Sequence, residues 1–345
     1  MNACITSPGR VNLIGEHTDY NGGWVLPAAL SVALTATVMP RNDRKLSIAA
    51  RGYSGTAERS LDDEADGSWS DPATGAMREA EAMGLIGAGA DIAVRSTIPA
   101  GSGLSSSAAL IVTLLKAARE LAGSTISDVE IAVAARRVEN EYMGVPCGIM
   151  DQMAVAIAKP GEAMALDTSS LDYRVVALPA SHHMVVIHSG LTRKLTDGRY
   201  AARKEECDAA KEAFGTDALC LLDPADIEAS AADPVLKRRA RHCASEHRRV
   251  ISAIGALEGG DAALFGRLMN ASHASMRDDF EMSLPEIDAL VDDAAALGAE
   301  GARLTGGGFG GCIVACVQAD AREEWQAALL ARHPRSRYID HIEAR

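Results

Sequence analysis

The sequence lacks the features that mark several large classes of protein. No apolar run approaches the roughly 20 residues that a membrane-spanning helix requires, and candidates such as 153–158 and 184–187 are far too short. Residues 1–8 lack the basic start and apolar core of a secretory signal. No internal repeat or low-complexity tract is visible. We therefore expect a globular, cytoplasmic protein that does not associate with membranes.

Cysteine is present, but not in a pattern that predicts metal binding or disulfides. The chain has seven cysteines, an odd number, and no two of them are spaced as Cys-x-x-Cys. Such a set is typical of reduced thiols in a cytosolic protein rather than of a zinc site or a disulfide framework. Cys312 and Cys316 stand in an apolar, strand-like run, so we expect them to fill the core.

Positive charge is scarce. The 34 lysines and arginines are outnumbered by 47 aspartates and glutamates, which gives a formal net charge of −13. This balance is unfavourable for binding nucleic acid or an anionic membrane. One basic cluster, residues 237–249, lies in a helical pattern, and we interpret it as a solvent-exposed helix face rather than a polyanion site.

The order of the predicted elements favours an α+β fold with two lobes. Residues 9–60 read mostly as strand, 91–96 as strand and 108–121 as helix. Ser127 and Glu130 have the spacing of a capping box for a helix over 127–143. Strands, helices, strands and helices follow one another without a regular βαβ alternation. We place the lobe boundary after residue 178, which gives an N-terminal domain 1–178 and a C-terminal domain 179–345.

Further elements are predicted from periodicity and turn signals. The segment 61–80 reads as an acidic surface excursion that leads into a short helix near 77–83. Strands are expected at 174–178, 184–189, 312–317 and 337–342, and helices at 199–214, 235–258, 261–276, 285–297 and 320–332. His182, His183 and His188 match no motif, and we interpret them as ordinary strand histidines.

The clearest local motif is a glycine- and serine-rich loop, residues 99–107, that runs into the helix 108–121. Glycines let backbone N–H groups converge, serines add hydroxyl donors, and the helix start contributes free N–H groups and a positive dipole end. Together these features predict a cradle for nucleotide phosphates. The pattern is not a Walker A loop, and an ordinary capped helix start is the alternative.

A second glycine run, Gly306–Gly311, formally contains GxGxxG. A strand-like run follows it instead of a helix, so a dinucleotide-binding fingerprint is excluded by context. Either a bare structural turn or a turn that lets a ligand approach the backbone would explain it.

Two polar clusters complete the chemistry. Gly9–Gly23 gathers Arg10, a glutamate, a histidine, an aspartate and a tyrosine around one strand and turn, which suits the paired donors and acceptors of a polyol. Residues 139–152 hold Glu139 late in a helix and Asp151 after a turn. One carboxylate could bind Mg²⁺ and another could orient or deprotonate a hydroxyl. Taken singly, a polar turn and solvated carboxylates are the simpler interpretations.

Taken together, these motifs resemble the galactokinase branch of the GHMP kinase superfamily. Gly9–Gly23 resembles the galactokinase signature almost throughout, 99–109 the nucleotide motif of the superfamily, and 304–315 its C-terminal glycine motif. Residues 147–152 and 272–280 are also similar to galactokinase segments. The resemblance spans most of the chain, and the sequence Glu-His-Thr-Asp at 16–19 is its most specific part.

The resemblance implies a role for each matching residue. Asp151 would be the carboxylate that faces the anomeric hydroxyl, and Arg10 would stabilise the transferring charge and the ionised aspartate. The implied sugar-binding residues are Glu16, His17, Thr18, Asp19, Asp151 and Tyr200, the phosphate loop is Gly101, Ser102, Gly103, Leu104, Ser105, Ser106 and Ser107, and the Mg²⁺ ligands are Ser107 and Glu139.

The resemblance also implies a fold and a reaction. The fold would have an N-terminal mixed α/β lobe, a C-terminal ferredoxin-like lobe and an active site between them. The reaction would transfer the γ-phosphoryl group of ATP to O1 of D-galactose, the first committed step of galactose catabolism, with Mg²⁺. We expect a monomer whose partners are galactose and ATP, with no nucleic acid and no membrane.

Three alternatives stay open. The first is a kinase for another sugar, such as N-acetylgalactosamine, arabinose or galacturonate. The second is a kinase for another superfamily substrate, such as mevalonate or homoserine, which residues 16–19 disfavour. The third is a non-enzymatic galactose sensor, which the complete serine run 105–107 and Asp151 disfavour.

Overall fold

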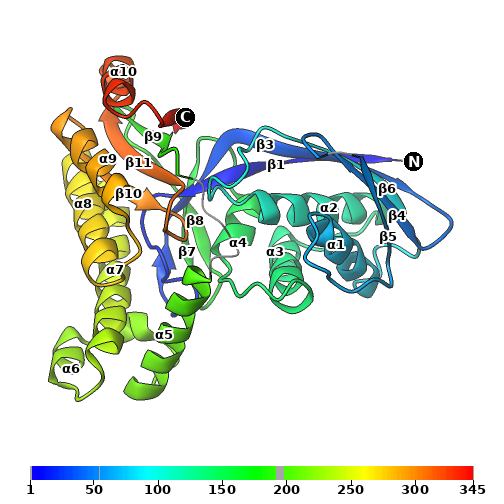
Figure 1. Cartoon of the computed structure of the whole chain (residues 1–345), viewed down its shortest axis with the longest axis horizontal. Helices are drawn as coiled ribbons and strands as arrows, with labels where there is room; N and C mark the ends of the chain where they lie inside the picture. The colour runs from blue at the N-terminus through cyan, green and yellow to red at the C-terminus, as the bar shows by residue number, and fades with distance from the viewer. Residues whose placement is uncertain (1, 54, 192–197, 345) are drawn as a thin grey trace. The chain divides into compact units, whose positions relative to one another are not determined.

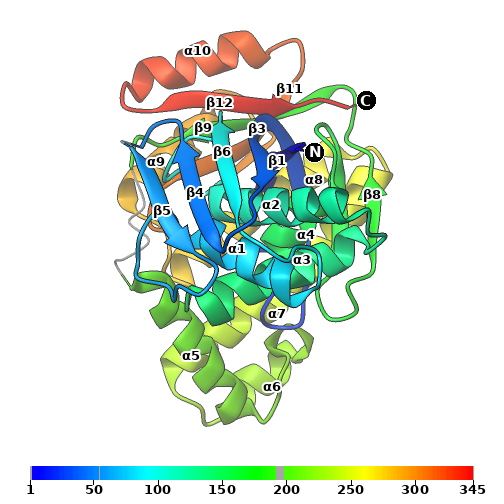
Figure 2. The same cartoon turned by 90° about the vertical axis from the view of Figure 1, so that its right-hand side faces the viewer.

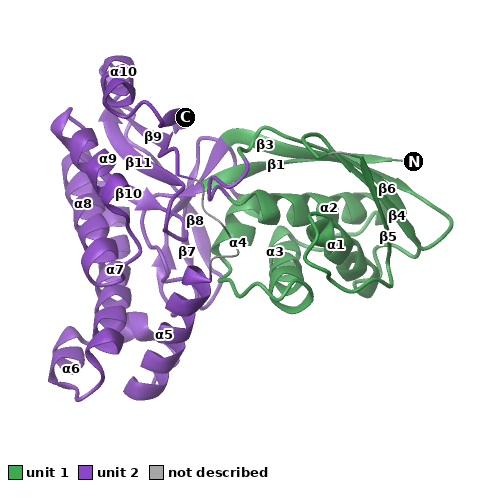
Figure 3. Ribbon diagram, viewed as in Figure 1, with its two compact units in different colours: residues 1–10, 31–99, 105–157 green, residues 11–30, 100–104, 158–345 purple. Residues whose placement is uncertain are grey.

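The computed structural model describes residues 2–53, 55–191 and 198–344, which group into two compact units (Figure 3). Unit 1 comprises residues 1–10, 31–99 and 105–157, and unit 2 comprises 11–30, 100–104 and 158–345. The chain therefore passes between the units several times. The predicted lobe boundary after residue 178 stays a prediction.

Unit 1 is built on a strongly twisted sheet that carries helices on one face (Figure 1). Its strands follow the order β3-β6-β4-β5, with β1 beside β3, and β4 and β6 pair in parallel. The strands are β1 (Ala3–Asn12), β3 (Pro27–Pro40), β4 (Lys45–Ala50), β5 (Thr56–Ser60) and β6 (Ala90–Ser96). The helices are α1 (Asp71–Ala82), α2 (Ser106–Ala122), α3 (Asp128–Arg137), the π-helical turn η1 (Val138–Tyr142) and α4 (Met150–Ile157).

The start of α1 corrects a prediction. The helix begins at Asp71 rather than near 77, and its first residues are buried. Pro72 is tolerated there because the first turn of a helix needs no N–H donor. The Asp71 carboxylate accepts hydrogen bonds from the N–H groups of Asp66 and Gly67 at 3.1 and 2.7 Å and pairs with Arg59 at 3.1 Å. The acidic excursion is therefore folded back onto the helix start.

Unit 2 contains two groups of paired strands. The first joins β2 (Trp24–Val25), β7 (Ala163–Asp167) and β8 (Tyr173–Val176), and β7 also pairs with Ala28 of β3. The other is antiparallel with the order β10-β11-β9-β12. Its strands are β9 (His182–His188), β10 (Gly301–Thr305), β11 (Cys312–Gln318) and β12 (Arg337–Ile342). Helices follow β9 and β11, so the βαββαβ topology confirms the ferredoxin-like prediction.

The helices of unit 2 match the predicted pattern closely. Helix α5 and strand β12 have the predicted limits, and β10 is a strand that the sequence reading did not identify. The helical elements are α5 (Arg199–Phe214), the 3₁₀ turn η3 (Leu219–Leu221), α6 (Pro224–Ala229), α7 (Pro234–Glu258), α8 (Ala262–Asp278), α9 (Pro285–Ala296) and α10 (Arg322–Arg332). Cys312 and Cys316 are fully buried, as predicted. No helix of the described segments has the length and apolar character needed to cross a membrane.

The basic cluster on α7 is not simply a solvent-exposed face, which corrects a second prediction. Arg239 is only 1% exposed and pairs with Glu206 at 2.5 Å and Glu281 at 2.7 Å. Arg241 pairs with Glu228 and Asp279. Much of the positive charge of α7 is therefore neutralised by carboxylates of neighbouring segments. A helical period alone does not reveal such partners.

Helix α8 and strand β10 approach each other closely enough that both need glycine at the contact. A Cβ atom added to Gly266 would lie 2.3 Å from the backbone of Glu300, and one added to Gly301 would lie 2.0 Å from the carbonyl oxygen of Gly266. The nearest atoms on both sides are backbone atoms, which could make room for a side chain only at a large cost in free energy. Gly255 in α7 is a useful contrast, because a Cβ there would meet nothing within 4 Å.

Two glycine-to-alanine variants should therefore have opposite effects on stability. Gly266→Ala should lower the free energy of unfolding by about 1–3 kcal/mol or more, because the methyl group overpacks against backbone. Gly255→Ala should raise it by about 0.5–1 kcal/mol, because alanine loses less backbone entropy in a helix. Urea unfolding followed by circular dichroism measures both. Equal effects in the two variants would contradict the close contact of α8 with β10.

Candidate active site

In unit 1, Arg10 of β1 forms a bidentate ion pair with Asp151 in the first turn of α4. Arg10 Nε donates to Asp151 Oδ1 at 2.6 Å, and Arg10 Nη2 donates to Oδ2 at 2.8 Å. Ser105 Oγ also donates to Asp151 Oδ2, at 2.6 Å. The arginine side chain is 5% exposed, whereas that of Asp151 is 31% exposed. The arrangement fixes the orientation of a carboxylate that still reaches solvent.

The predicted phosphate loop has an unusual backbone. Gly101, Gly103 and Ser105 all have left-handed φ values, of 67°, 75° and 63°. Glycine adopts this conformation at no steric cost, but serine does so at a cost of about 1 kcal/mol or more. Ser105 is the N-cap residue of α2, yet its side chain makes no cap hydrogen bond and reaches Asp151 instead. The first N–H groups of a 17-residue helix are thus not capped by this side chain.

Close to Ser107 in unit 1 lies a buried carboxylate suited to a cation. Glu139 in η1 is 8% exposed, accepts a hydrogen bond from Gln152 and lies 3.6 Å from Cys147 Sγ. No ion pair found among the described residues involves Glu139. Burial raises its pKa, and the nearby Asp151 carboxylate adds to the rise while the Ser107 hydroxyl opposes it.

These residues fit a magnesium ion. The Ser107 hydroxyl is buried and makes no regular hydrogen bond within the described segments, although it lies close to Glu139. Mg²⁺ prefers hard oxygen ligands and commonly takes one or two from protein side chains. The Ser107 hydroxyl and the buried Glu139 carboxylate, which has no ion-pair partner among the described residues, would supply such a pair.

In unit 2, Glu16 is buried and engaged by the protein itself. It is 2% exposed, pairs with Arg303 of β10, and accepts from the N–H of Gly306 at 2.9 Å. Thr305 Oγ1 also lies 3.2 Å from its carboxylate. Burial raises the pKa of Glu16 and Arg303 opposes the rise. Through these contacts Glu16 fixes the position of the 16–19 segment at the end of β10.

A second buried carboxylate extends this network. Glu246 of α7 is fully buried, lies 3.8 Å from Arg303, pairs with Arg249 at 2.7 Å and accepts from Ser272 Oγ at 2.6 Å. It also accepts from the N–H of Gly15 at 3.0 Å. Burial alone would raise the pKa of Glu246, but the two guanidinium groups outweigh it and lower the pKa to about 2. Arg303 and Glu246 were not identified from the sequence.

The rest of the 16–19 segment divides into buried and accessible residues. Thr18 is fully buried and donates to the carbonyl oxygens of Gly15 and Trp24. His17, 5% exposed with φ of 61°, lies 5.2 Å from the Tyr200 ring and 4.5 Å from the Phe280 ring, centroid to centroid. Asp19 and Tyr200 are half-buried. Unit 2 thus brings the predicted sugar-binding residues 16–19 and Tyr200 together.

His242 of α7 contacts the backbone of this segment. Its Nε2 lies 3.1 Å from the carbonyl oxygen of Glu16, and its Nδ1 lies 2.9 Å from Ser275 Oγ. The side chain is fully buried, and burial lowers the pKa of His242 to about 4. The prediction that residues 237–249 form a solvent-exposed face is wrong for His242, because α7 turns this side chain toward the core.

The two glycine-rich runs meet backbone to backbone in unit 2. A Cβ atom on Gly306 would lie 3.2 Å from the carbonyl oxygen of Gly103, and one on Gly311 would lie 3.0 Å from that of Ser102. Both glycines have left-handed φ values. The second run therefore has at least a structural reason for its glycines, since it lies against the first part of the phosphate loop.

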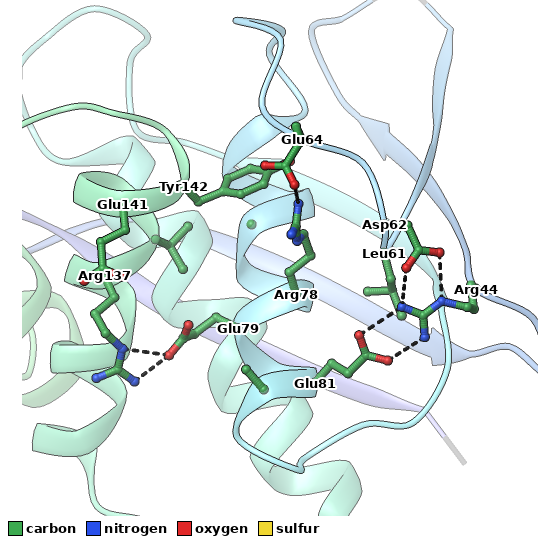
Figure 4. A pocket seen from close by; sticks show the side chains of 13 residues that line it. Arg44, Leu61, Asp62, Glu64, Arg78, Glu79, Glu81, Arg137, Glu141 and Tyr142 are labelled. Carbon is green, nitrogen blue, oxygen red and sulfur yellow. Dashed lines mark hydrogen bonds and ion pairs between the residues drawn. The ribbon is translucent and has the colours of Figure 1, made fainter.

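The large pocket of unit 1 is not the predicted active site. Its volume is about 560 Å³, and Figure 4 shows that its labelled arginines are paired with carboxylates. Arg44 bonds to Asp62 and Glu81, and Arg78 pairs with Glu64. Arg137 pairs likewise with Glu79. The lining has three arginines and five carboxylates, so it is acidic overall, and it contains none of the predicted site residues.

Comparison with known proteins decides the family. Residues 2–40 match the galactokinase galactose-binding signature, 72–159 the GHMP kinases N terminal domain, and 253–334 the GHMP kinases C terminal family. The crystal structure of Lactococcus lactis galactokinase complexed with galactose is 31% identical in sequence, covers 99% of this chain and 94% of that one, and has a TM-score of 0.94. This chain belongs to the galactokinase family of GHMP kinases. The predicted two-lobed GHMP kinase fold is thereby confirmed.

More distant GHMP kinases share the fold alone. Mevalonate kinase of Methanococcus jannaschii is 18% identical, with 100% of this chain and 99% of that one covered and a TM-score of 0.72. Phosphomevalonate kinase of Streptococcus pneumoniae is 12% identical, with 98% of each chain covered and a TM-score of 0.74. The roles of the individual site residues stay predictions.

Stability should depend on pH through His242. The pKa of His242 is about 4 in the folded chain, whereas an unperturbed histidine, as in the unfolded chain, has a pKa of 6.5. The unfolded chain therefore binds the proton first as pH falls. The free energy of unfolding should therefore drop between pH 6.5 and 4, by about 2 kcal/mol from pH 7 to pH 5 for this group.

Urea unfolding at several pH values measures the effect. His242→Gln should remove about that much of the drop, whereas His333→Gln, at a half-buried surface histidine paired with Asp293, should leave most of it. An unchanged pH dependence in His242→Gln would show that this histidine is not held neutral by the fold.

Proposed function

We propose that this chain transfers the γ-phosphoryl group of ATP to O1 of D-galactose, giving galactose 1-phosphate and ADP. One observation carries the proposal. The galactokinase signature over residues 2–40 contains Arg10, and Arg10 holds Asp151 in a bidentate ion pair. The similarity of the whole chain to a galactokinase crystallised with galactose supports the same substrate.

In this mechanism Asp151 is the catalytic carboxylate. It accepts the proton of O1–H as O1 forms a bond to Pγ and the bond from Pγ to the bridging oxygen of ADP breaks. Arg10 orients the carboxylate and supplies positive charge near the transferring group. Ser105 fixes the same carboxylate through its hydroxyl. Most of the acceleration would come from positioning and charge stabilisation.

The other half of the proposal concerns binding. Glu16, His17, Thr18, Asp19 and Tyr200 form the sugar site, with Asp19 and Tyr200 as the accessible polar groups. Residues 101–107 bind the ATP phosphates through N–H groups and hydroxyls. Ser107 and Glu139 hold Mg²⁺, which when bound would neutralise phosphate charge. We further propose a cytoplasmic monomer with no nucleic-acid partner.

Coupled ADP release tests the reaction. With Mg·ATP, the chain should release ADP rapidly with galactose, and slowly or not at all with mevalonate or homoserine. Asp151→Asn should lower kcat at least about a hundredfold, because the proton acceptor is lost. Asp128→Asn, at a half-buried carboxylate of α3 that pairs with Arg119 in the same unit, is the matched control and should stay near wild type.

Two outcomes would redirect the proposal. Faster release with another sugar would keep the reaction but change the substrate. Galactose binding without ADP release for any acceptor would indicate a sensor.

The magnesium assignment has its own test. Glu139→Gln should raise the Mg²⁺ concentration needed for half-maximal rate at least tenfold, because a charged ligand becomes neutral. Glu141→Gln provides the control, since Glu141 lies on the same π-helical turn but is exposed. Titrating the rate with Mg²⁺ at fixed ATP measures both. The same metal requirement in both variants would remove Glu139 from the site.

A further inference from the structure

One edge of the four-stranded sheet of unit 2 gathers three side chains that the kinase reaction does not use. They are His183 of β9, His341 of β12 and Glu343 directly after β12. One potential ligand atom of each lies within 4.8 Å of the others. Strand β12, red in Figure 2, is the edge strand and pairs with β9.

The strand register explains why these side chains meet. His341 lies opposite Val185, so His183, two residues along β9, points to the same face. Glu343 follows His341 by two residues and continues that face. A register shift between Tyr338 and Asp340 acts like a bulge, so Tyr338 and His341 share a face although they are three residues apart.

The surroundings leave the imidazoles available to a ligand. Tyr338 Oη lies 2.6 Å from His341 Nδ1, which fixes the ring and leaves Nε2 for another partner. His183 Nε2 is 3.8 Å from Glu343 Oε2, beyond hydrogen-bond distance, and its Nδ1 is buried without a hydrogen-bond partner within the described segments.

We propose that His183, His341 and Glu343 bind a divalent transition metal ion of the zinc class. Two imidazoles and one carboxylate are ligands that Zn²⁺ takes, with water in the remaining position. Ligand atoms around tetrahedral zinc lie roughly 3.3 Å apart. The 3.8 Å gap from His183 to Glu343 therefore needs only a small side-chain rotation to close.

Charge and topology define what the ion would do. Arg322 at the start of α10 is the nearby opposing cation, and its guanidinium is engaged by Gln326 and Glu323. Glu343 offsets its charge. The ion would join the last strand of the chain to β9, so it would stabilise the folded state by mass action. The site differs in chemistry from the oxygen-only magnesium site.

Zinc titration of the metal-stripped full chain tests the proposal. A competing chromophoric chelator reports the affinity for Zn²⁺. Wild type should bind one equivalent that His183→Ala and His341→Ala each weaken at least tenfold. His333→Ala is the matched control, because His333 is also a half-buried histidine of unit 2 but pairs with Asp293. It should bind as wild type does.

Two further readouts separate this site from other metal-binding groups. Zn²⁺ should raise the melting temperature of wild type and of His333→Ala but not of His341→Ala. Co²⁺ should give weak ligand-field bands without a thiolate charge-transfer band, since no cysteine is a ligand. Absence of saturable Zn²⁺ binding, unchanged affinity in both alanine variants, or a thiolate band would each overturn the proposal.

Discussion

The buried guanidinium of Arg303 is the point on which unit 2 depends. Arg303 is fully buried on β10, pairs with Glu16 in the signature segment and lies 3.8 Å from Glu246 of α7. It also lies 3.3 Å from the carbonyl oxygen of Asn12. A buried charge is expensive unless fully partnered, and removing one partner typically costs about 3–5 kcal/mol. Three distant parts of the chain are therefore held in one arrangement because any other leaves an unpaired buried charge.

This network changes how the signature segment is understood. Glu16 directs its carboxylate to Arg303, Thr305 and the N–H of Gly306, and Thr18 directs its hydroxyl to backbone carbonyls. These two residues position the segment rather than offer free groups to a ligand. Asp19 and Tyr200, which we propose as sugar-binding residues, are half-buried rather than buried. A short motif can thus combine residues that shape a site with residues that contact a substrate.

The sequence predicted what local signals determine. The limits of α5 and β12 follow from periodicity and turn residues close in the chain, and the Ser127–Glu130 capping box is present. The prediction that Arg239 and His242 are exposed is wrong, because their burial depends on the distant residues Glu206, Glu281 and Glu16. Arg303 and Glu246 escaped notice for the same reason. A charged residue looks solvent-exposed in sequence unless its distant partner is known.

The polar contacts of Asp151, the proposed catalytic carboxylate, are similarly defined. An ionised carboxylate offers about four lone-pair sites, and Arg10 takes two of them while Ser105 takes a third. Counting the bonds made within the described segments, one acceptor position remains on this carboxylate, which is 31% exposed. One hydroxyl can therefore be held at a time, in a direction that Arg10 sets. In a loose phosphoryl-transfer transition state such positioning contributes more than a strong base would, because little proton transfer is needed before the phosphoryl group moves.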